Sequence, residues 1–170
     1  MQPKYLAVLR WALNALLVLA AFLVESVCFG RDGVAGARLS LFPVAAVAVA
    51  LCSGAAQGGM FCLIAGILYA LTGTDMGTIT LVAVTLVGTL AGGACQVYFR
   101  QHLLPALLFG ALVLILSDGT IFALKLYLGI AHLSKLYTSV LPGMAMSLGS
   151  MLLAFPLSWK ISRIGGEVYG

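Results

Sequence analysis

The chain has 170 residues, of which 62% are hydrophobic and only 8% are charged, and its formal net charge is +4. About a quarter of the residues in a soluble domain are charged, so this chain cannot cover a globule with polar surface. The composition therefore excludes a soluble domain and predicts an integral membrane protein. The apolar runs are continuous rather than alternating, which favours transmembrane helices over a β-barrel.

The apolar runs predict one transmembrane helical domain, residues 1–170, folded as an all-α compact bundle of about six transmembrane helices. A span needs about 20 apolar residues, so this length leaves no room for a soluble domain. The expected helices cover residues 5–29, 39–53, 60–72, 79–99, 103–128 and 137–158. The second and third are short, so they form either thin spans or a hairpin that does not fully cross the bilayer.

Lys and Arg residues lie at the ends of the apolar runs, a pattern that reflects orientation in the membrane and contact with anionic lipid rather than nucleic-acid binding. The first run follows Lys4 and Arg10, and we interpret it as a retained anchor rather than a cleaved signal peptide. The charge bias predicts a multi-pass plasma-membrane protein with both termini in the cytoplasm. The expected inner residues are Lys4, Arg10, Arg100, Lys160 and Arg163, and the expected outer residues are Arg31, Arg38, Lys125 and Lys135.

Small residues recur four apart between residues 54 and 93, a spacing that lets membrane helices approach closely. This density predicts a packed helical hairpin at the centre of the bundle. The candidate residues for helix packing or partner contact are Gly54, Gly58, Gly66, Gly88 and Gly92. The pairs Gly66–Ala70 and Gly73–Gly77 follow the same spacing.

Three polar side chains are candidates for a role inside the membrane: Asn14, Asp118 and Lys125. Asn14 is expected to hydrogen-bond to another helix or to backbone. Asp118 lies in SDGT, residues 117–120, where a kink or break is expected. Asp118 and Lys125 either lie near the outer headgroup edge, or Asp118 is a buried carboxylate paired with another helix or a partner protein. A third possibility, a proton or ion relay, lacks a second carboxylate.

No HExxH, GxSxG or Walker pattern occurs in the chain, and no CxxC pair occurs among its four cysteines. We therefore expect no catalytic residues, no cofactor, no metal site and no disulfide framework. The sequence favours a non-enzymatic protein.

Several motifs follow one another in a recognisable order. The segment RLSLFPVAAVAVAL, residues 38–51, opens an apolar helix with an arginine, a short gap and a proline. FCLIAGILYALTG follows at residues 61–73, LVGTLAGG at 86–93, and FPLSWKISRIGG from Phe155. In order, length and spacing, the chain from about Arg38 to its end resembles the MreD-type rod-shape-determining membrane proteins. It departs from that family at Ala70, where the family often has an aspartate, whose role would be lost or taken over by Asp75 or Asp118.

The resemblance implies a scaffold of the bacterial elongation machinery that docks MreC and helps position or regulate peptidoglycan synthesis. The implied partners beyond MreC are the wall-synthesis pair of a SEDS glycosyltransferase and a transpeptidase, together with MreB. The family is similar in helix layout to the substrate-binding components of energy-coupling-factor vitamin transporters, and such a component is the alternative function. That alternative requires an outward polar pocket lined by residues such as Asn14, Glu25, Asp118 and Lys125.

Overall fold

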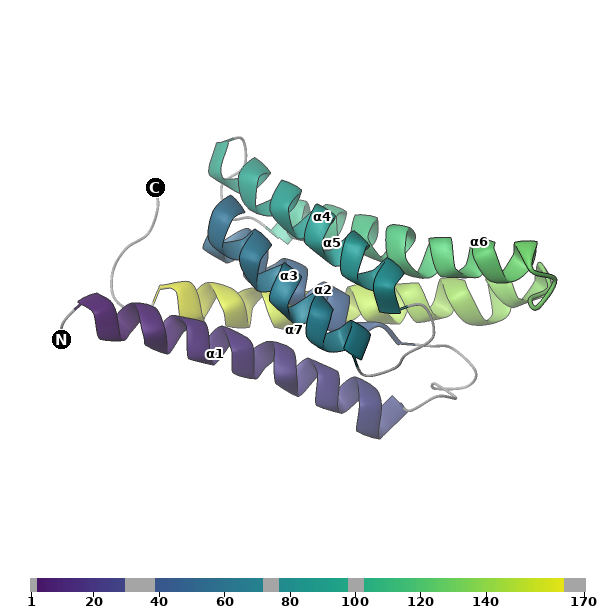
Figure 1. The fold of residues 1–170 in the computed structure, drawn as a ribbon, viewed down its shortest axis with the longest axis horizontal. Coiled ribbons are helices and arrows are strands. Elements are labelled where there is room, and N and C mark those ends of the chain that lie inside the picture. The colour runs from purple at the N-terminus through teal and green to yellow at the C-terminus, as the bar shows by residue number, and fades with distance from the viewer. Residues whose placement is uncertain (1–2, 30–38, 72–76, 98–102, 164–170) are drawn as a thin grey trace.

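The computed structural model describes residues 3–29, 39–71, 77–97 and 103–163, and within these ranges the chain is helical with short connections and no strand. Figure 1 shows long helices packed side by side along one axis. Several of them are continued by π-helical segments, labelled η. The elements are α1 (Pro3–Val24), η1 (Glu25–Phe29), α2 (Leu41–Ser53), α3 (Ala55–Leu71), α4 (Gly77–Val97), α5 (Leu103–Leu114), η2 (Ile115–Gly119), α6 (Thr120–Tyr127), η3 (Leu136–Val140) and α7 (Leu141–Ser162).

The π-helical segments continue their neighbouring helices, so the described chain forms six helical rods, close to the six predicted ranges. The main difference is the start of the third rod, which lies at Ala55 rather than at residue 60. The expected helix ranges left residues 54–59 as the connection between the second and third rods, but only Gly54 leaves the helix, with a φ of 85°. Gly58 and Gly59 remain helical because both lie buried against neighbouring helices. The kink predicted at SDGT corresponds to the π-helical segment η2.

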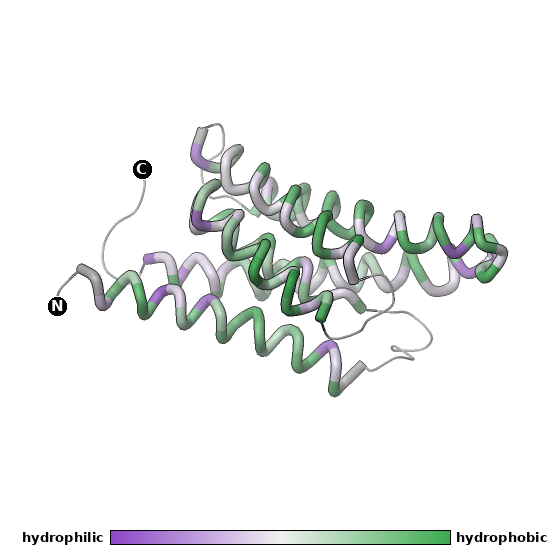
Figure 2. Tube along the Cα trace, viewed as in Figure 1, coloured by the Kyte–Doolittle hydropathy of each residue, from purple (hydrophilic) through white to green (hydrophobic). Residues whose placement is uncertain are grey.

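Four of the rods are long and apolar enough to cross a membrane: residues Tyr5–Val27, Gly77–Gln96, Leu103–Tyr127 and Leu136–Ser162. The other two, α2 and α3, are also apolar but have 13 and 17 residues. At 1.5 Å per residue these two helices are about 20 and 26 Å long, which is shorter than a hydrocarbon core of about 30 Å. Figure 2 shows hydrophobic residues along the rods and the strongly hydrophilic ones mostly toward their ends. The outward faces carry many exposed Leu, Ile and Val side chains.

The centre of the bundle is α2 rather than the predicted glycine-rich hairpin. Every residue from Phe42 to Leu51 is buried, because α1, α3, α4, α5 and α7 all pack against this helix. Such burial suits its sequence, which is apolar on all sides and rich in Val and Ala. The helices α3 and α4 do pair closely, but α3 also has an outer face with exposed side chains such as Leu68. The expected central hairpin is therefore a layer against α2.

The two ends of the bundle differ. In Figure 1, α1 begins and α7 ends at the same end of the molecule. At the other end, α6 and η3 reach farther along the long axis than α1 and α3 do. Neither α6 nor η3 contains a buried residue. The hairpin that they form is thus the least covered part of the described chain.

Candidate functional site

A partly buried polar network surrounds the N-terminus of α2, and Glu25 of η1 is its first member. One carboxylate oxygen, Oε2, accepts a hydrogen bond of 2.8 Å from the backbone N–H of Phe42. The other, Oε1, accepts a hydrogen bond of 3.0 Å from the hydroxyl of Tyr69 on α3. Glu25 therefore connects α1, α2 and α3 at one point.

Asp118 of η2 holds the same helix end from another side. Its Oδ1 accepts a hydrogen bond of 3.0 Å from the hydroxyl of Ser40, the residue just before α2. The backbone N–H of Ser40 donates to Ser147 Oγ on α7 at 2.9 Å. Ser147 is fully buried and donates in turn to the carbonyl of Gly143 at 2.8 Å. The polar groups of five elements thus meet at the start of α2.

Elementary electrostatics explains why both carboxylates lie here. The first N–H groups of a helix lack intrahelical acceptors, and the helix dipole places partial positive charge at this end. Because the N-terminus of α2 is buried, these groups need partners within the protein. Both carboxylates come from π-helical segments, which change the direction in which side chains leave a helix. The network therefore anchors the central helix.

Aromatic rings cover the Glu25 side of this network. Phe42 and Tyr69 stack with ring centroids 4.5 Å apart and an interplanar angle of 12°. Phe22 of α1 packs edge-on against both rings, at centroid distances of 6.3 and 6.0 Å. These ring contacts involve Phe42 and Tyr69, the two residues that donate hydrogen bonds to Glu25, so the same side chains pack together and hold the carboxylate.

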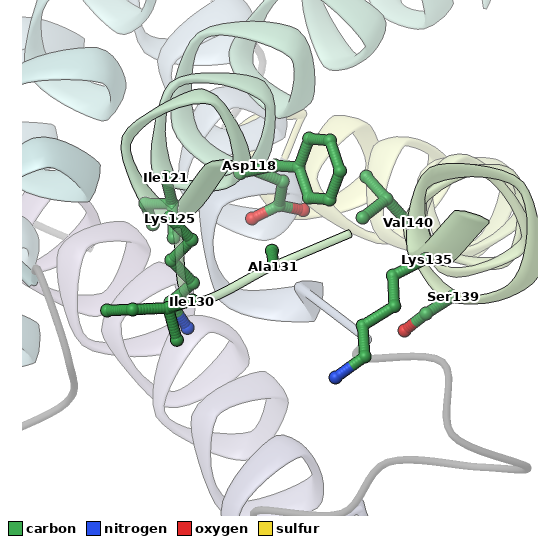
Figure 3. Close-up of a pocket in the computed structure, with 9 residues that line it drawn as sticks. Asp118, Ile121, Lys125, Ile130, Ala131, Lys135, Ser139 and Val140 are labelled. Atoms are coloured by element: carbon green, nitrogen blue, oxygen red, sulfur yellow. The ribbon is translucent and has the colours of Figure 1, made fainter. Parts of the chain in front are cut away.

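Asp118 also lines a pocket of about 270 Å³, together with Lys125 of α6 and Lys135 in the loop before η3. Figure 3 shows these side chains around the pocket between α6 and the start of the last rod. Asp118 thus lies in the network and at the pocket wall at once. Asp118 is half-buried, and its hydrogen bond joins it to Ser40, the residue directly before α2. Lys125 lines the same pocket as Asp118.

Asn14 is buried in α1, with 6% of its surface exposed, and lies apart from the network and the pocket. Its Oδ1 has no hydrogen-bond donor among the described residues. Of the four residues proposed for an outward polar pocket, Asp118 and Lys125 line the pocket described above, and Asn14 and Glu25 are not among its described lining residues. Glu25 faces the start of α2 instead.

The five candidate glycines all lie at close contacts within the chain. An added Cβ at Gly58 would lie 2.7 Å from Ala50 Cα, and one at Gly92 would lie 2.7 Å from the carbonyl carbon of Gly54. At Gly66 it would lie 3.2 Å from Leu81 Cα, and at Gly88 it would meet the side chain of Cys62. At Gly54 it would meet the side chain of Gln96. These positions pack α2, α3 and α4 together, so their faces are covered by the chain itself.

Gln57 and His132 are exposed. Gln96 accepts a long hydrogen bond of 3.5 Å from the backbone N–H of Ala55. Asp75, His102 and Gly73 lie outside the described residues. Within the described ranges, no group of three or more His, Cys, Asp or Glu side chains is placed to hold a metal ion, and Cys52, Cys62 and Cys95 are free thiols.

Sequence reasoning missed Ser40, Tyr69 and Ser147, and it considered Glu25 only for a ligand pocket. Two signals pointed to the network: an acidic residue at the end of the first apolar run, and a serine directly before the second. No family model matches the chain, and it has no match among curated proteins or solved structures.

Proposed function

We propose that this protein is a non-enzymatic membrane scaffold of the bacterial elongation machinery, of the MreD type, that docks MreC. Through MreC it would help position or regulate the SEDS glycosyltransferase and the transpeptidase, alongside MreB. The observation that carries the proposal is the use of the half-buried and buried polar groups at the start of α2. Glu25, Asp118 and Ser147 all hold the N-terminus of α2, so the polar interior serves the fold rather than a reaction.

The outer surface supports the same function. The helix faces that do not pack against α2 are apolar, with exposed side chains such as Leu16 on α1, Leu68 on α3 and Leu104 on α5. The connections between helices are short in sequence, so a protein partner has few extramembrane residues to contact. A partner's transmembrane helix would therefore pack on these apolar faces by dispersion and close approach.

The departure from the family at Ala70 also has a physical counterpart. Ala70 is half-buried in α3, directly after Tyr69. The carboxylate that reaches α3 at this level comes from Glu25, which accepts the Tyr69 hydroxyl hydrogen bond. An acidic group from η1 thus contacts the residue directly before the position where the family often has its own aspartate. We infer that Glu25 supplies this acidic group to the scaffold, in place of the expected Asp75 or Asp118.

The test is affinity purification of the tagged protein in mild detergent, with mass spectrometry of the associated proteins. We expect MreC and the wall-synthesis enzymes to be recovered, and an equally tagged unrelated multi-pass protein serves as the control. A photo-crosslinking residue at exposed Leu68 or Leu104 then identifies the docking face, with buried Ala65 as the matched position that should not crosslink. Absence of MreC from the purified material and from every crosslink would refute the proposal.

The pocket favours a second candidate, a substrate-binding component of an energy-coupling-factor vitamin transporter. It brings together one carboxylate and two ammonium groups, which suits a small polar ligand. The same purification separates the two functions, because a transporter component would recover a coupling subunit with two ATPases. Both the scaffold proposal and the transporter proposal assume the helix layout of the energy-coupling-factor components, in which all six rods cross the membrane.

A further inference from the structure

The pocket beside Asp118 lies at the far end of the molecule from the start of α1, where α6 turns back toward the last rod. Its polar lining consists of Asp118, Lys125, Lys135 and Ser139. Its apolar walls are Ile121, Phe122, Ile130, Ala131 and Val140. These residues run from Asp118 in η2 to Val140 in η3, so one hairpin provides the described lining of the pocket.

The charges in the pocket favour an anion. Lys125 and Lys135 contribute two positive charges, and Asp118 contributes one negative charge that already accepts a hydrogen bond from Ser40. The two lysines approach from opposite sides of the hairpin, one from α6 and one from the loop. In Figure 3, the carboxylate of Asp118 lies on the opposite side of Ala131 from both ammonium groups. A ligand between the lysines would therefore meet net positive potential.

The surroundings favour an amphiphile over a fully soluble anion. Tyr127 and Tyr137 belong to the same hairpin and are exposed, and aromatic residues of this kind concentrate at membrane interfaces. Leu128, Ile130 and Leu133 are also exposed at the same end. A molecule held here by its anionic group would keep its apolar part in contact with apolar side chains.

The size of the pocket agrees with a headgroup. Sites for drug-sized ligands measure about 300–1,000 Å³. The volume of about 270 Å³ lies just below that range, so the pocket can accommodate a phosphate with its adjoining carbons but not a whole lipid. Lysine is a common phosphate ligand, as a point charge that needs no fixed orientation.

We propose that this pocket binds the phosphate of an anionic membrane lipid, with Lys125 and Lys135 as its cationic ligands and the wall around Ile121 and Val140 contacting the adjoining carbons. The inference is independent of MreC docking, since every residue it uses belongs to one hairpin of this chain.

The experiment measures lipid binding to the full chain in detergent by native mass spectrometry. Phosphatidylglycerol is compared with phosphatidylcholine of the same acyl chains, and inorganic phosphate is titrated as a competitor. The pocket variant is Lys125→Gln with Lys135→Gln. The matched control is Lys160→Gln with Arg163→Gln. It also removes two positive charges, but from exposed side chains near the other end of the molecule. Ala131→Trp fills the pocket and keeps both lysines.

We expect phosphatidylglycerol to bind more tightly than phosphatidylcholine, and the pocket variant to bind it on the order of 30-fold more weakly, because a basic residue near anionic lipid contributes about a factor of 5. The control should bind as the natural chain does, and Ala131→Trp should lose the binding with its charges intact. Far-UV circular dichroism checks that each variant is folded.

Three outcomes would overturn the proposal. Equal loss in the pocket variant and in the matched control would show general attraction between basic residues and lipid. Full binding in Ala131→Trp would show that the pocket is not the site. Binding of inorganic phosphate without preference for phosphatidylglycerol would assign the lysines to a soluble anion instead of a lipid.

Discussion

Gly92 offers the sharpest test of how the bundle is packed. It lies on α4 against the turn between α2 and α3, where an added Cβ would be 2.7 Å from the carbonyl carbon and oxygen of Gly54 and 2.9 Å from the amide nitrogen of Ala55. All three atoms are backbone, so no side-chain rotation can relieve the contact. Ordinary van der Waals contact begins near 3.4 Å. Gly92→Ala therefore forces α4 away from the turn by about 0.7 Å, the difference between 3.4 and 2.7 Å.

The expected magnitude follows from two opposing effects. Overpacking a tight contact costs about 1–3 kcal/mol, and a clash with backbone belongs at the upper end of that range. Replacing glycine by alanine within a helix contributes about 0.5–1 kcal/mol in the stabilising direction. We therefore expect Gly92→Ala to lower the free energy of unfolding by roughly 2 kcal/mol.

The next residue provides a matched control. A Cβ added at Gly93 would lie 3.6 Å from Ala55 Cβ, which is an ordinary contact. Gly93→Ala should therefore be neutral or more stable by up to about 1 kcal/mol. Unfolding of both variants in mixed micelles with an increasing fraction of denaturing detergent, followed by far-UV circular dichroism, measures the difference. Equal stability of the two variants would refute the close packing of α4 on the turn.

The larger change Gly92→Leu, and likewise Gly88→Leu, should abolish folding or partner co-purification.

Three further predictions concern the interior. Glu25→Ala should lower the free energy of unfolding by about 2–4 kcal/mol, since it removes two hydrogen bonds to a charged acceptor. A double-mutant cycle with Tyr69→Phe should show that the effects of the two substitutions are coupled. Strictly additive effects would contradict the hydrogen bond between Tyr69 and Glu25. Asp118→Asn should change the free energy of unfolding by less than about 1 kcal/mol, because the amide oxygen can still accept a hydrogen bond from the Ser40 hydroxyl. Asp118→Leu, which removes this acceptor, should lower the free energy of unfolding by about 1–3 kcal/mol. Equal effects of the two substitutions in the same detergent assay would show that this hydrogen bond does not stabilise the protein. In a variant with Cys62 as its only cysteine, maleimide should react only after unfolding, because this thiol is fully buried; rapid labelling in mild detergent would argue against the packing of α3.

The positions of the helices were predictable because each rod is a long apolar run that ends at glycines or charges. The predicted start of the fourth rod differs from the observed one by two residues, and the predicted fifth rod starts at the observed residue, Leu103. The third rod was predicted to start too late because glycine is read as a helix breaker. In this bundle Gly58 and Gly59 are helical, since neighbouring backbones occupy the space that side chains would need. The sequence around Gly58 and Gly59 does not indicate which backbone segments will contact them.

For the polar network and the pocket, as for the helices, some features follow from the sequence and others from the tertiary structure. The composition and the continuous apolar runs indicated the helical class and the apolar exterior. The few polar residues within those runs stood out as candidates, because burying uncompensated charge is costly wherever the chain folds. Only the tertiary structure decided that Glu25 and Asp118, 93 positions apart in sequence, both hold the N-terminus of α2, and that Asn14 stays apart from them. It also placed α2, rather than the glycine-rich hairpin, at the centre. The physical reason is that hydrogen-bond partners and buried faces depend on which helices become neighbours, and that choice is made by packing across the whole bundle.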